Sequence, residues 1–386
     1  MIDKRLLLTP GPTPVPDRVA LAGIGAIHHR TVEFETILEQ VFSGLKYVFQ
    51  TENDVLIFAA SGTGAMEAAV ANLLSPEDRA IVVGGGKFSE RWVEILNRYQ
   101  VRPIEVEVPW GEAVSTDQIE TALRDHPDAE AVFTVFSETS TGTVTDLGAI
   151  GQVVADSEVV LVTDAVSGLL AMELRPDAWG VDVVVSGSQK GLMLPPGLGF
   201  VSVSAKAWRR VEKSELPRYY FDFSAYREKL PRQMPYTAPI SLILQLHRSL
   251  EMIHDEGIER IWERHRVLAE AARAGVRALG LELLSRAPGN AVTAVKLPVG
   301  IDGKQFLQLL RDRYGVILTG GQKHLKGRIF RIAHLGYMNA SDVIVGLSAI
   351  ERGLKRLGHP VELGAAVAAA QRVFSEFEEL SVSVSV

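Results

Sequence analysis

A lysine stands shortly after a hydrophobic run of this sequence, behind small hydroxyl residues and a glycine. The run Val183-Val184-Val185 shows no polar alternation, which is typical of a strand buried on both faces of a parallel sheet. Lys190 ends the stretch that follows, Ser186-Gly187-Ser188-Gln189-Lys190. An ε-amine in this position is either an ordinary surface lysine of a loop or a nucleophile that forms a Schiff base with a carbonyl group.

Other chemically useful groups also follow strand-like runs. Ser61-Gly62-Thr63-Gly64 comes after residues 55–58, the hydroxyl-rich segment 137–142 comes after residues 132–135, and Asp164 comes after residues 159–163. In an open parallel sheet, ligands bind outside the carboxyl ends of the strands, so we expect these groups and Lys190 to share one rim. Each group also has a simpler explanation, because Ser and Thr cap helices without any ligand and an isolated Asp often lies in a turn.

Taken together, these groups match the needs of an enzyme that uses pyridoxal phosphate (PLP). Such an enzyme requires a lysine for the Schiff base, a carboxylate that keeps the pyridine nitrogen protonated, and a helix N-terminus for the phosphate. Lys190, Asp164 and the segment 61–64 supply these three groups. Asp164 precedes Lys190 by one helix and one strand, which predicts that the two lie on neighbouring strands and face one cleft.

Alternating strand-like and helical segments must position these residues. The expected strands cover residues 55–58, 80–83, 131–135, 159–163 and 181–185, with 199–203 paired beside the last, and the expected helices cover 65–74, 90–98 and 147–155. This alternation predicts βαβ units and a mostly parallel sheet with helices on both faces. The fold class is therefore α/β, with a doubly wound large domain.

The pattern changes towards the second half of the chain. Helical periodicity covers residues 240–256, 258–279, 303–314 and 340–357, and strand-like runs cover 291–297, 316–318 and 329–332. We therefore expect a large domain of residues 1–250 and a smaller C-terminal α+β domain of residues 251–386. The alternating end of the chain, residues 381–386, predicts either an edge strand or a disordered tail.

Composition excludes several classes of function. The 386 residues carry a net charge of −7 without a concentrated basic stripe, which argues against nucleic acid as a partner. No apolar stretch is long enough for a membrane span and no signal-peptide core follows Met1, so we expect a cytoplasmic protein without a membrane partner. Cysteine is absent, and the adjacent pair His28-His29 would point to opposite faces of an extended chain, so we expect no metal site.

Several short motifs, taken in their order and spacing along nearly the whole chain, carry a family resemblance. They are Thr9-Pro10-Gly11-Pro12, Tyr47-Val48-Phe49-Gln50-Thr51, Ser61-Gly62-Thr63-Gly64, Glu138-Thr139-Ser140-Thr141-Gly142, Thr163-Asp164-Ala165-Val166-Ser167, Ser186-Gly187-Ser188-Gln189-Lys190, Tyr236-Thr237-Ala238-Pro239 and Arg331-Ile332-Ala333-His334-Leu335-Gly336. On these motifs the chain resembles fold-type I PLP enzymes, the class-V aminotransferases, and among them the alanine/serine–glyoxylate aminotransferase group.

The resemblance implies a role for each matching residue. Lys190 would form the Schiff base with PLP and then carry the proton between the substrate Cα and the cofactor. Arg331 would bind the substrate carboxylate in a bidentate manner, for which a planar guanidinium is suited. The residues implied to hold the cofactor are Ser61, Gly62, Thr63 and Gln189 at the phosphate, Asp164 at the pyridine nitrogen, Val166 under the ring, and Thr139 beside the phenolic oxygen.

The resemblance also implies a homodimer with shared active sites, because Tyr236 and Thr237 match a segment that reaches the phosphate of a neighbouring subunit. Phe88 matches the ring-stacking position, which is often Trp in the alanine–glyoxylate members; a core aromatic at a helix start is the alternative. Gly11 would lie at the substrate pocket. Whether His28-His29-Arg30 lines that pocket with Gly11 or forms a solvated loop stays open, and so does the identity of the amino donor.

These inferences predict a transaminase that moves an amino group from serine or alanine to glyoxylate or pyruvate. A cysteine desulfurase is nearly excluded, because the persulfide needs a cysteine that the chain lacks. An NAD-dependent oxidoreductase would rest on Gly62-Thr63-Gly64, but Glu67 takes the third glycine position of the dinucleotide fingerprint. A PLP-fold partner subunit that has lost turnover is the non-enzymatic alternative.

Overall fold

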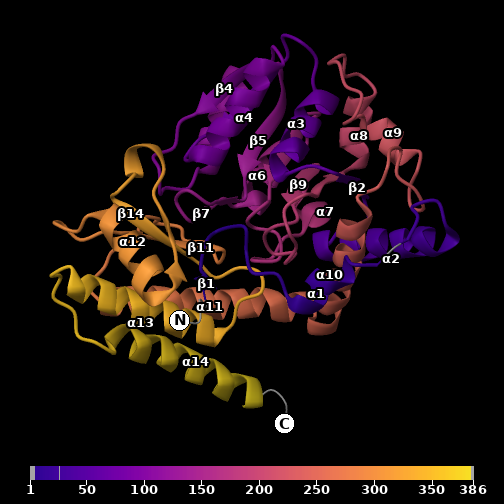
Figure 1. Ribbon diagram of the computed structural model, residues 1–386. Coiled ribbons are helices and arrows are strands. Elements are labelled where there is room, and N and C mark those ends of the chain that lie inside the picture. Colours follow the sequence, from indigo (N-terminus) through magenta and orange to yellow (C-terminus); the bar gives the residue numbers. More distant parts are fainter. Residues whose placement is uncertain (1–4, 26, 384–386) are drawn as a thin grey trace.

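The computed structural model describes residues 5–25 and 27–383, and its largest element is a seven-stranded sheet (Figure 1). The sheet has the order β2-β10-β9-β8-β5-β3-β4. Its strands are β2 (Asp54–Phe58), β3 (Arg79–Val83), β4 (Arg102–Val106), β5 (Ala129–Val135), β8 (Val160–Asp164), β9 (Val183–Gly187) and β10 (Gly199–Val203). Neighbouring strands from β9 to β4 run parallel, and β10 lies antiparallel between β2 and β9. The predicted α/β class is confirmed.

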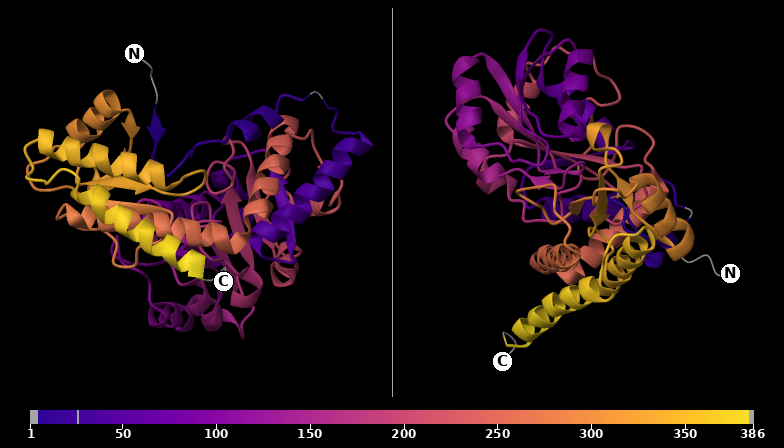
Figure 2. Two further views of the ribbon diagram at one scale, coloured as in Figure 1. Left: turned by 90° about the horizontal axis from the view of Figure 1, so that it is seen from below. Right: turned by 90° about the vertical axis from the view of Figure 1, so that its left-hand side faces the viewer.

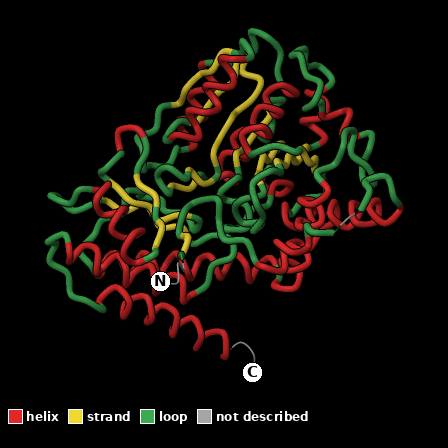
Figure 3. Tube along the Cα trace, in the orientation of Figure 1, coloured by secondary structure: helices red, strands yellow, loops and turns green. Residues whose placement is uncertain are grey.

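The central strands of this sheet are covered on both faces. Every residue of β8, β9 and β10 is buried, which explains why their sequences are apolar runs without alternation. The covering helices are α3 (Gly62–Leu73), α4 (Lys87–Arg98), α5 (Thr116–Asp125), α6 (Leu147–Val154), α7 (Pro176–Trp179) and α8 (Ala205–Val211). They form two groups, since α3 contacts α4 and α8 whereas α6 contacts α5 and α7, and Figure 3 shows helices flanking the strands.

Three further helices and a short hairpin also belong to this part of the molecule. The N-terminal part contributes α1 (Asp17–Ala22) and α2 (Val32–Phe49), and later segments contribute the hairpin of β6 (Ser137–Glu138) and β7 (Thr143–Val144) and the helix α9 (Phe223–Arg227). The α2 helix begins at Thr31, whose side chain accepts a hydrogen bond from the Phe34 backbone N–H. Its apolar face, which includes Leu38 and Leu45, is buried, and the helix packs against α10 (Ile240–Glu256).

The C-terminal part forms a second, smaller arrangement. Its antiparallel sheet has the order β11 (Val292–Lys296), β14 (Ile329–Ala333), β13 (Thr319–Gly320), with a short 3₁₀ helix at Lys323–Leu325. Its helices are α11 (Ile258–Ala278), α12 (Gly303–Tyr314), α13 (Ala340–Arg356) and α14 (Ala365–Ser383). Figure 2 shows α12, α13 and α14 gathered away from the large sheet, with α14 lying along α11.

Two hydrophobic cores meet within α11. Ile258 and Ile261 at the start of this helix belong to the core of the large sheet, whereas Leu268 and later residues belong to the second core. The division of the chain at residue 250 stays a prediction.

The N-terminus joins the second arrangement. β1 (Leu6–Leu7) pairs in parallel with β12 (Val316–Ile317), and Leu8 is buried in the second core. The chain then runs back to the large sheet, where the Thr13 backbone N–H donates to the Gln189 carbonyl at 3.1 Å. The first residues therefore connect the two cores.

The end of the chain differs from its sequence pattern. α14 continues to Ser383, so residues 381–383 are helical where the alternation predicted an edge strand or a disordered tail, and the rest of that segment lies outside the described residues. The alternating pattern is short, and the preceding helix extends over it. Among the helices described, none combines the length and the apolar character that crossing a bilayer requires.

Candidate active site

One cavity of about 260 Å³ collects most of the predicted site residues. It is lined by Gly11, Pro12, Ser61, Gly62, Thr63, Met66, Phe88, Arg91, Asp164, Val166, Gln189, Lys190 and Pro196. These residues come from the N-terminal segment, the start of α3, the start of α4 and the carboxyl ends of β8 and β9. The predicted convergence on one rim of the sheet is therefore what the structure shows.

Lys190 is the buried amine of this cavity. Only 7% of its surface is exposed, and its Nζ donates hydrogen bonds to the Pro10 carbonyl and to Ser167 Oγ, the latter at 3.2 Å. Burial lowers the pKa of Lys190 to about 8, although the nearby Asp164 carboxylate acts in the opposite direction. A substantial neutral fraction near physiological pH makes this amine a competent nucleophile.

Asp164 ends the strand adjacent to β9, as predicted. It is 3% exposed, and its Oδ1 accepts a hydrogen bond from the Val166 backbone N–H at 2.8 Å. Burial raises the pKa of Asp164 to about 6, so the carboxylate is mostly ionised at neutral pH. The buried carboxylate can therefore accept a hydrogen bond from a protonated ring nitrogen.

The start of α3 fits a phosphate group. Ser61 occupies the N-cap position, yet its side chain makes no capping hydrogen bond, so the first N–H groups of the helix face the cavity without a side-chain acceptor. Gln189 Oε1 is buried beside this helix start without a hydrogen-bond partner among the described residues. Turning the Gln189 amide by 180° would direct an N–H donor there. The donors present thus fit the phosphate that a PLP enzyme must hold.

Arg331 and Thr139 lie next to the cavity but do not line it. The Arg331 guanidinium is buried and donates from Nε to the Gly320 carbonyl at 3.0 Å and from Nη1 to the Thr139 carbonyl at 2.9 Å. Burial lowers the pKa of Arg331 to about 10. No carboxylate forms an ion pair with it among the described residues, so this cation has capacity for the carboxylate of a ligand.

A hydroxyl pair links this region to the lysine. Thr139 Oγ1 and Ser167 Oγ are 2.6 Å apart, and Ser167 also accepts from the Lys190 amine. Thr139, whose carbonyl binds Arg331, therefore lies between the guanidinium and the amine. Ser167 was not among the predicted site residues.

Phe88 occupies the first turn of α4, and a buried carboxylate holds that turn in place. Glu138 Oε2 accepts from the backbone N–H groups of Phe88 at 3.0 Å and Ser89 at 3.2 Å, and Oε1 accepts from the Ser140 backbone N–H at 3.0 Å. Burial raises the pKa of Glu138, while these donors favour its ionised form. A Cβ on Gly86 would lie 2.2 Å from the Glu138 carboxyl carbon, so only glycine allows this approach.

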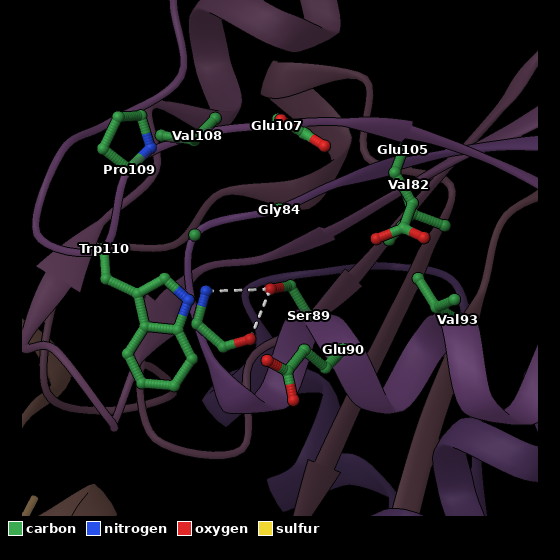
Figure 4. A pocket seen from close by; sticks show the side chains of 12 residues that line it. Val82, Gly84, Ser89, Glu90, Val93, Glu105, Glu107, Val108, Pro109 and Trp110 are labelled. Atoms are coloured by element: carbon green, nitrogen blue, oxygen red, sulfur yellow. Dashed lines mark hydrogen bonds between the residues drawn. The ribbon is translucent and has the colours of Figure 1, made fainter. Parts of the chain in front are cut away.

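A second cavity, of about 390 Å³, lies beside the same turn and contains none of the predicted site residues. In Figure 4, Ser89 closes the turn by accepting from the Gly86 N–H at 3.0 Å and donating to the Gly86 carbonyl at 2.8 Å. Glu90, Glu105 and Trp110 are among the side chains around it. It is separate from the cavity of Lys190.

Tyr236 and Thr237 do not line the cavity of Lys190. Tyr236 donates its hydroxyl to the Tyr219 carbonyl at 2.9 Å, and its ring stacks on Tyr220 with centroids 5.1 Å apart. Thr237 is exposed. Their predicted approach to the phosphate of a neighbouring subunit stays a prediction.

The N-terminal segment covers the lysine from another side. Gly11 adopts φ +120°, and a Cβ there would lie 2.5 Å from Lys190 Cε, so glycine is required for both conformation and space. His28 is exposed and His29 half-buried, and neither lines the cavity. Their rings are tilted by 32° with centroids 4.6 Å apart, so the expectation that the two side chains point to opposite faces is wrong. The described residues contain no cluster of His, Asp or Glu side chains arranged to hold a metal ion.

The sequence interpretation missed three residues that shape this site. Arg91 lies one helical turn after Phe88, so the i+3 spacing could have indicated that both face the cavity. Ser167 stands three residues after Asp164 within a quoted motif. Glu138 was also part of a quoted motif, but its isolated position in a hydroxyl-rich turn gave no signal that it is buried.

Comparison with known proteins assigns the chain to a family. The model of the family "Aminotransferase class-V" matches residues 18–343. Among curated proteins, a serine–glyoxylate aminotransferase of Methylorubrum extorquens is 35% identical, with 96% of each chain covered. The small subunit of a soluble hydrogenase of a Synechococcus strain is 44% identical, with 97% of this chain and all of the relative covered.

The solved structures give the same fold. An alanine–glyoxylate aminotransferase of a Nostoc species superposes with a TM-score of 0.87 at 31% identity, covering 92% of this chain and 96% of the other. The likeness therefore extends over both the large sheet and the C-terminal arrangement.

Proposed function

This chain belongs to the class-V aminotransferase family, and from that membership we propose that it is a PLP-dependent transaminase acting on small amino acids. The amino donor is serine or alanine and the acceptor is glyoxylate or pyruvate. The names of the serine–glyoxylate and alanine–glyoxylate relatives support this substrate class.

One observation carries the proposal. Lys190 and Asp164 follow adjacent parallel strands and line one cavity together with the uncapped start of α3. A buried amine, a buried carboxylate and free helix N–H groups in one cavity are the groups that a pyridoxal ring and its phosphate require.

The residues of this chain have separate tasks in such a reaction. When bound, PLP supplies an electron sink that stabilises negative charge at the substrate Cα. Lys190, whose amine has a lowered pKa and is partly neutral near physiological pH, would hold the cofactor through its Nζ and, once released, would accept and return the proton of the substrate Cα. The buried Asp164 carboxylate would keep the pyridine nitrogen protonated, because an ionised carboxylate in a buried position is stabilised by a cationic partner.

Substrate orientation falls to Arg331. Its two hydrogen bonds to the Gly320 and Thr139 carbonyls fix the guanidinium plane, so a substrate carboxylate meets donors that are already oriented. Thr139 and Ser167 then connect this binding point to Lys190, which places the α-carbon of a bound amino acid near the amine.

We further propose that the protein works as a homodimer. Tyr236 and Thr237 carry hydroxyl groups on a segment that the cavity of the same chain does not include. In the family resemblance this segment reaches the phosphate held by another subunit.

The experiment is a titration of purified protein with PLP, followed by borohydride reduction and peptide mapping. Covalent attachment at Lys190 is expected, and the visible absorption of the bound cofactor should bleach with serine or alanine and return with glyoxylate or pyruvate. Arg331→Lys should bind PLP normally but lower kcat/KM for the amino acid roughly 10²-fold, because the two-pronged contact is lost. Attachment at another lysine, or no bleaching with any amino acid, would refute the proposal.

A second candidate is a partner subunit without turnover, which the name of the Synechococcus relative favours. The chain has no cysteine, so it offers no thiolate for an iron–sulfur cluster or a nickel–iron centre, and a role beside a hydrogenase would not include cysteine ligation of such a centre. Turnover of serine and glyoxylate by the isolated, purified chain distinguishes the two candidates.

A further inference from the structure

Arg91 is a guanidinium in the active-site cavity to which the family resemblance gives no task. It lies on α4, one helical turn after Phe88, and its Cζ is 4.8 Å from the centroid of the Phe88 ring. It lines the cavity together with Lys190, Asp164 and the start of α3.

A hydrogen bond from Arg91 determines which way the hydroxyl proton of Thr63 points. Arg91 Nη1 donates to Thr63 Oγ1 at 3.0 Å. A guanidinium has no acceptor, so Thr63 must be the acceptor in this bond and its own O–H is free to donate elsewhere. Thr63 stands in the first turn of α3, where the unpaired backbone N–H groups lie, so its proton is available to the same anion as those groups.

The charge of Arg91 forms no ion pair within residues 5–25 and 27–383, although it acts to lower the pKa of Asp164 and Glu94 from a longer distance. Its neighbours Glu90 and Glu94 are engaged by Lys87 at 3.2 and 2.8 Å. Burial dominates the pKa of both Asp164 and Lys190, and the charge of Arg91 acts on both as a smaller effect. A partly buried cation inside a cavity is stabilised when an anion occupies that cavity.

We propose that Arg91 is a phosphate-recognition residue. It orients Thr63 as a hydrogen-bond donor towards the phosphoryl group at the start of α3 and supplies the positive charge that balances it. The inference rests on the proposed use of PLP and adds to it the source of selectivity for the phosphorylated cofactor over its unphosphorylated form. Arg91 is thus a positioning residue that acts partly through Thr63.

The position of Arg91 distinguishes this task from two others. A guanidinium that served a second carboxylate of the substrate would be expected near Arg331, but Arg91 is bonded to the helix start that would hold the phosphate. A guanidinium that only supported the Phe88 ring would influence the whole pyridoxal ring, whether or not a phosphate is attached.

The test measures dissociation constants of cofactor-free protein for PLP, for pyridoxal and for inorganic phosphate. Arg91→Gln should weaken PLP and inorganic phosphate about tenfold or more, as expected for the loss of a charge-assisted contact, and leave pyridoxal within about twofold. Thr63→Val should weaken PLP less, and the double variant should lose less than the product of the two single effects, because the residues act together. Arg98→Gln, on the exposed end of the same helix, is the matched control and should bind all three like the wild type.

The outcomes separate the possibilities. Equal losses for PLP and pyridoxal in Arg91→Gln would assign Arg91 to the ring and overturn the inference. Unchanged cofactor binding with a raised KM only for dicarboxylic amino acids would assign it to the substrate and also overturn the inference. A wild-type protein that binds no PLP at all would instead refute the proposed function itself.

Discussion

Two regions of the molecule differ in the exposure of their side chains. One is the cavity wall formed by β8, β9 and α3, and the other is the segment of residues 219–237. In the wall, Asp164 and Lys190 are 3% and 7% exposed. In the segment, the Tyr219 side chain is 80% exposed. Neighbouring tyrosine rings lie there beside the exposed Thr237. Clusters of exposed aromatic side chains are typical of surfaces that bind another molecule.

The difference teaches that one chain positions the amine and the carboxylate by itself, whereas the segment 219–237 lies outside that cavity. The wall needs only the contacts of its own chain to position an amine and a carboxylate. The hydroxyl groups of Tyr236 and Thr237 in the segment 219–237 do not line that cavity, which supports the proposal that they bind at the active site of a second copy of the chain.

The largest expected effect on activity comes from removing the amine of Lys190. Lys190→Ala should lower transamination by more than about 10³-fold, because the nucleophile and the proton carrier are lost together. The variant should remain folded, since it replaces a buried amine by an apolar group. Initial rates with serine and glyoxylate, together with circular dichroism, check this expectation, and a variant that retains more than a tenth of the wild-type rate would contradict it.

The first turn of α4, which carries Phe88 into the cavity, should depend on the buried Glu138 carboxylate. Glu138→Gln places an amide nitrogen near donors that need an acceptor, so it should lower the free energy of unfolding by about 1–3 kcal/mol. Urea denaturation measures the loss. Glu94→Gln, on the α4 helix that Glu138 holds, is the control, since its exposed pair with Lys87 should contribute less than about 1 kcal/mol. Equal effects of the two substitutions would mean that Glu138 does not anchor α4.

Mixing two variants should show whether the segment 219–237 of one chain acts at the Lys190 cavity of another. A Tyr236→Phe/Thr237→Val double variant should bind PLP about tenfold more weakly, from the loss of hydroxyl contacts to the phosphate across the interface. When it is refolded together with Lys190→Ala at low PLP, one site of each mixed dimer regains a complete set of residues, so up to about a quarter of wild-type activity should return. No recovery on mixing would indicate that each chain completes its own site.

A pH dependence of stability is expected in the protein without cofactor. Burial lowers the pKa of Lys190 from 10.5 to about 8, so between these values the unfolded chain holds a proton that the native protein lacks. Stability should therefore rise with pH across this window, by at most about 3.4 kcal/mol. Burial raises the pKa of Asp164 from 3.8 to about 6, so its contribution falls as pH rises to about 6 and is constant above.

Comparing the wild type with Lys190→Met isolates this contribution. Thermal melts from pH 7.5 to 10.5 should show the rise in the wild type and a smaller slope in the variant. Identical slopes would show that the amine is as well hydrated in the native protein as in the unfolded chain.

The sequence was sufficient to place the chemical groups on one rim because parallel strands end at the same edge. Lys190 and Asp164 each follow an apolar run, and this simple rule brought them together correctly. The long helices of residues 240–256 and 303–314 were also predicted with the bounds that α10 and α12 have, since their apolar residues recur every three to four positions.

Weak patterns explain most of the elements that were not predicted. β4 is an edge strand that contains Pro103 and exposed residues, so its sequence lacks an apolar run. α5 buries only Ile119, which is too little for a visible periodicity. The buried state of Glu138 depends on four donors from two separate segments, and no local pattern encodes such a contact.

The pairing of β1 with β12 has a consequence for how the protein is made. Leu6 and Leu7 leave the ribosome long before their partners Val316 and Ile317, which follow them by about 310 residues of chain. The segment that follows them, through Gly11 and Thr13, covers Lys190. The segment that encloses Lys190 is therefore anchored at its N-terminal side only late in biosynthesis, once β12 has been made.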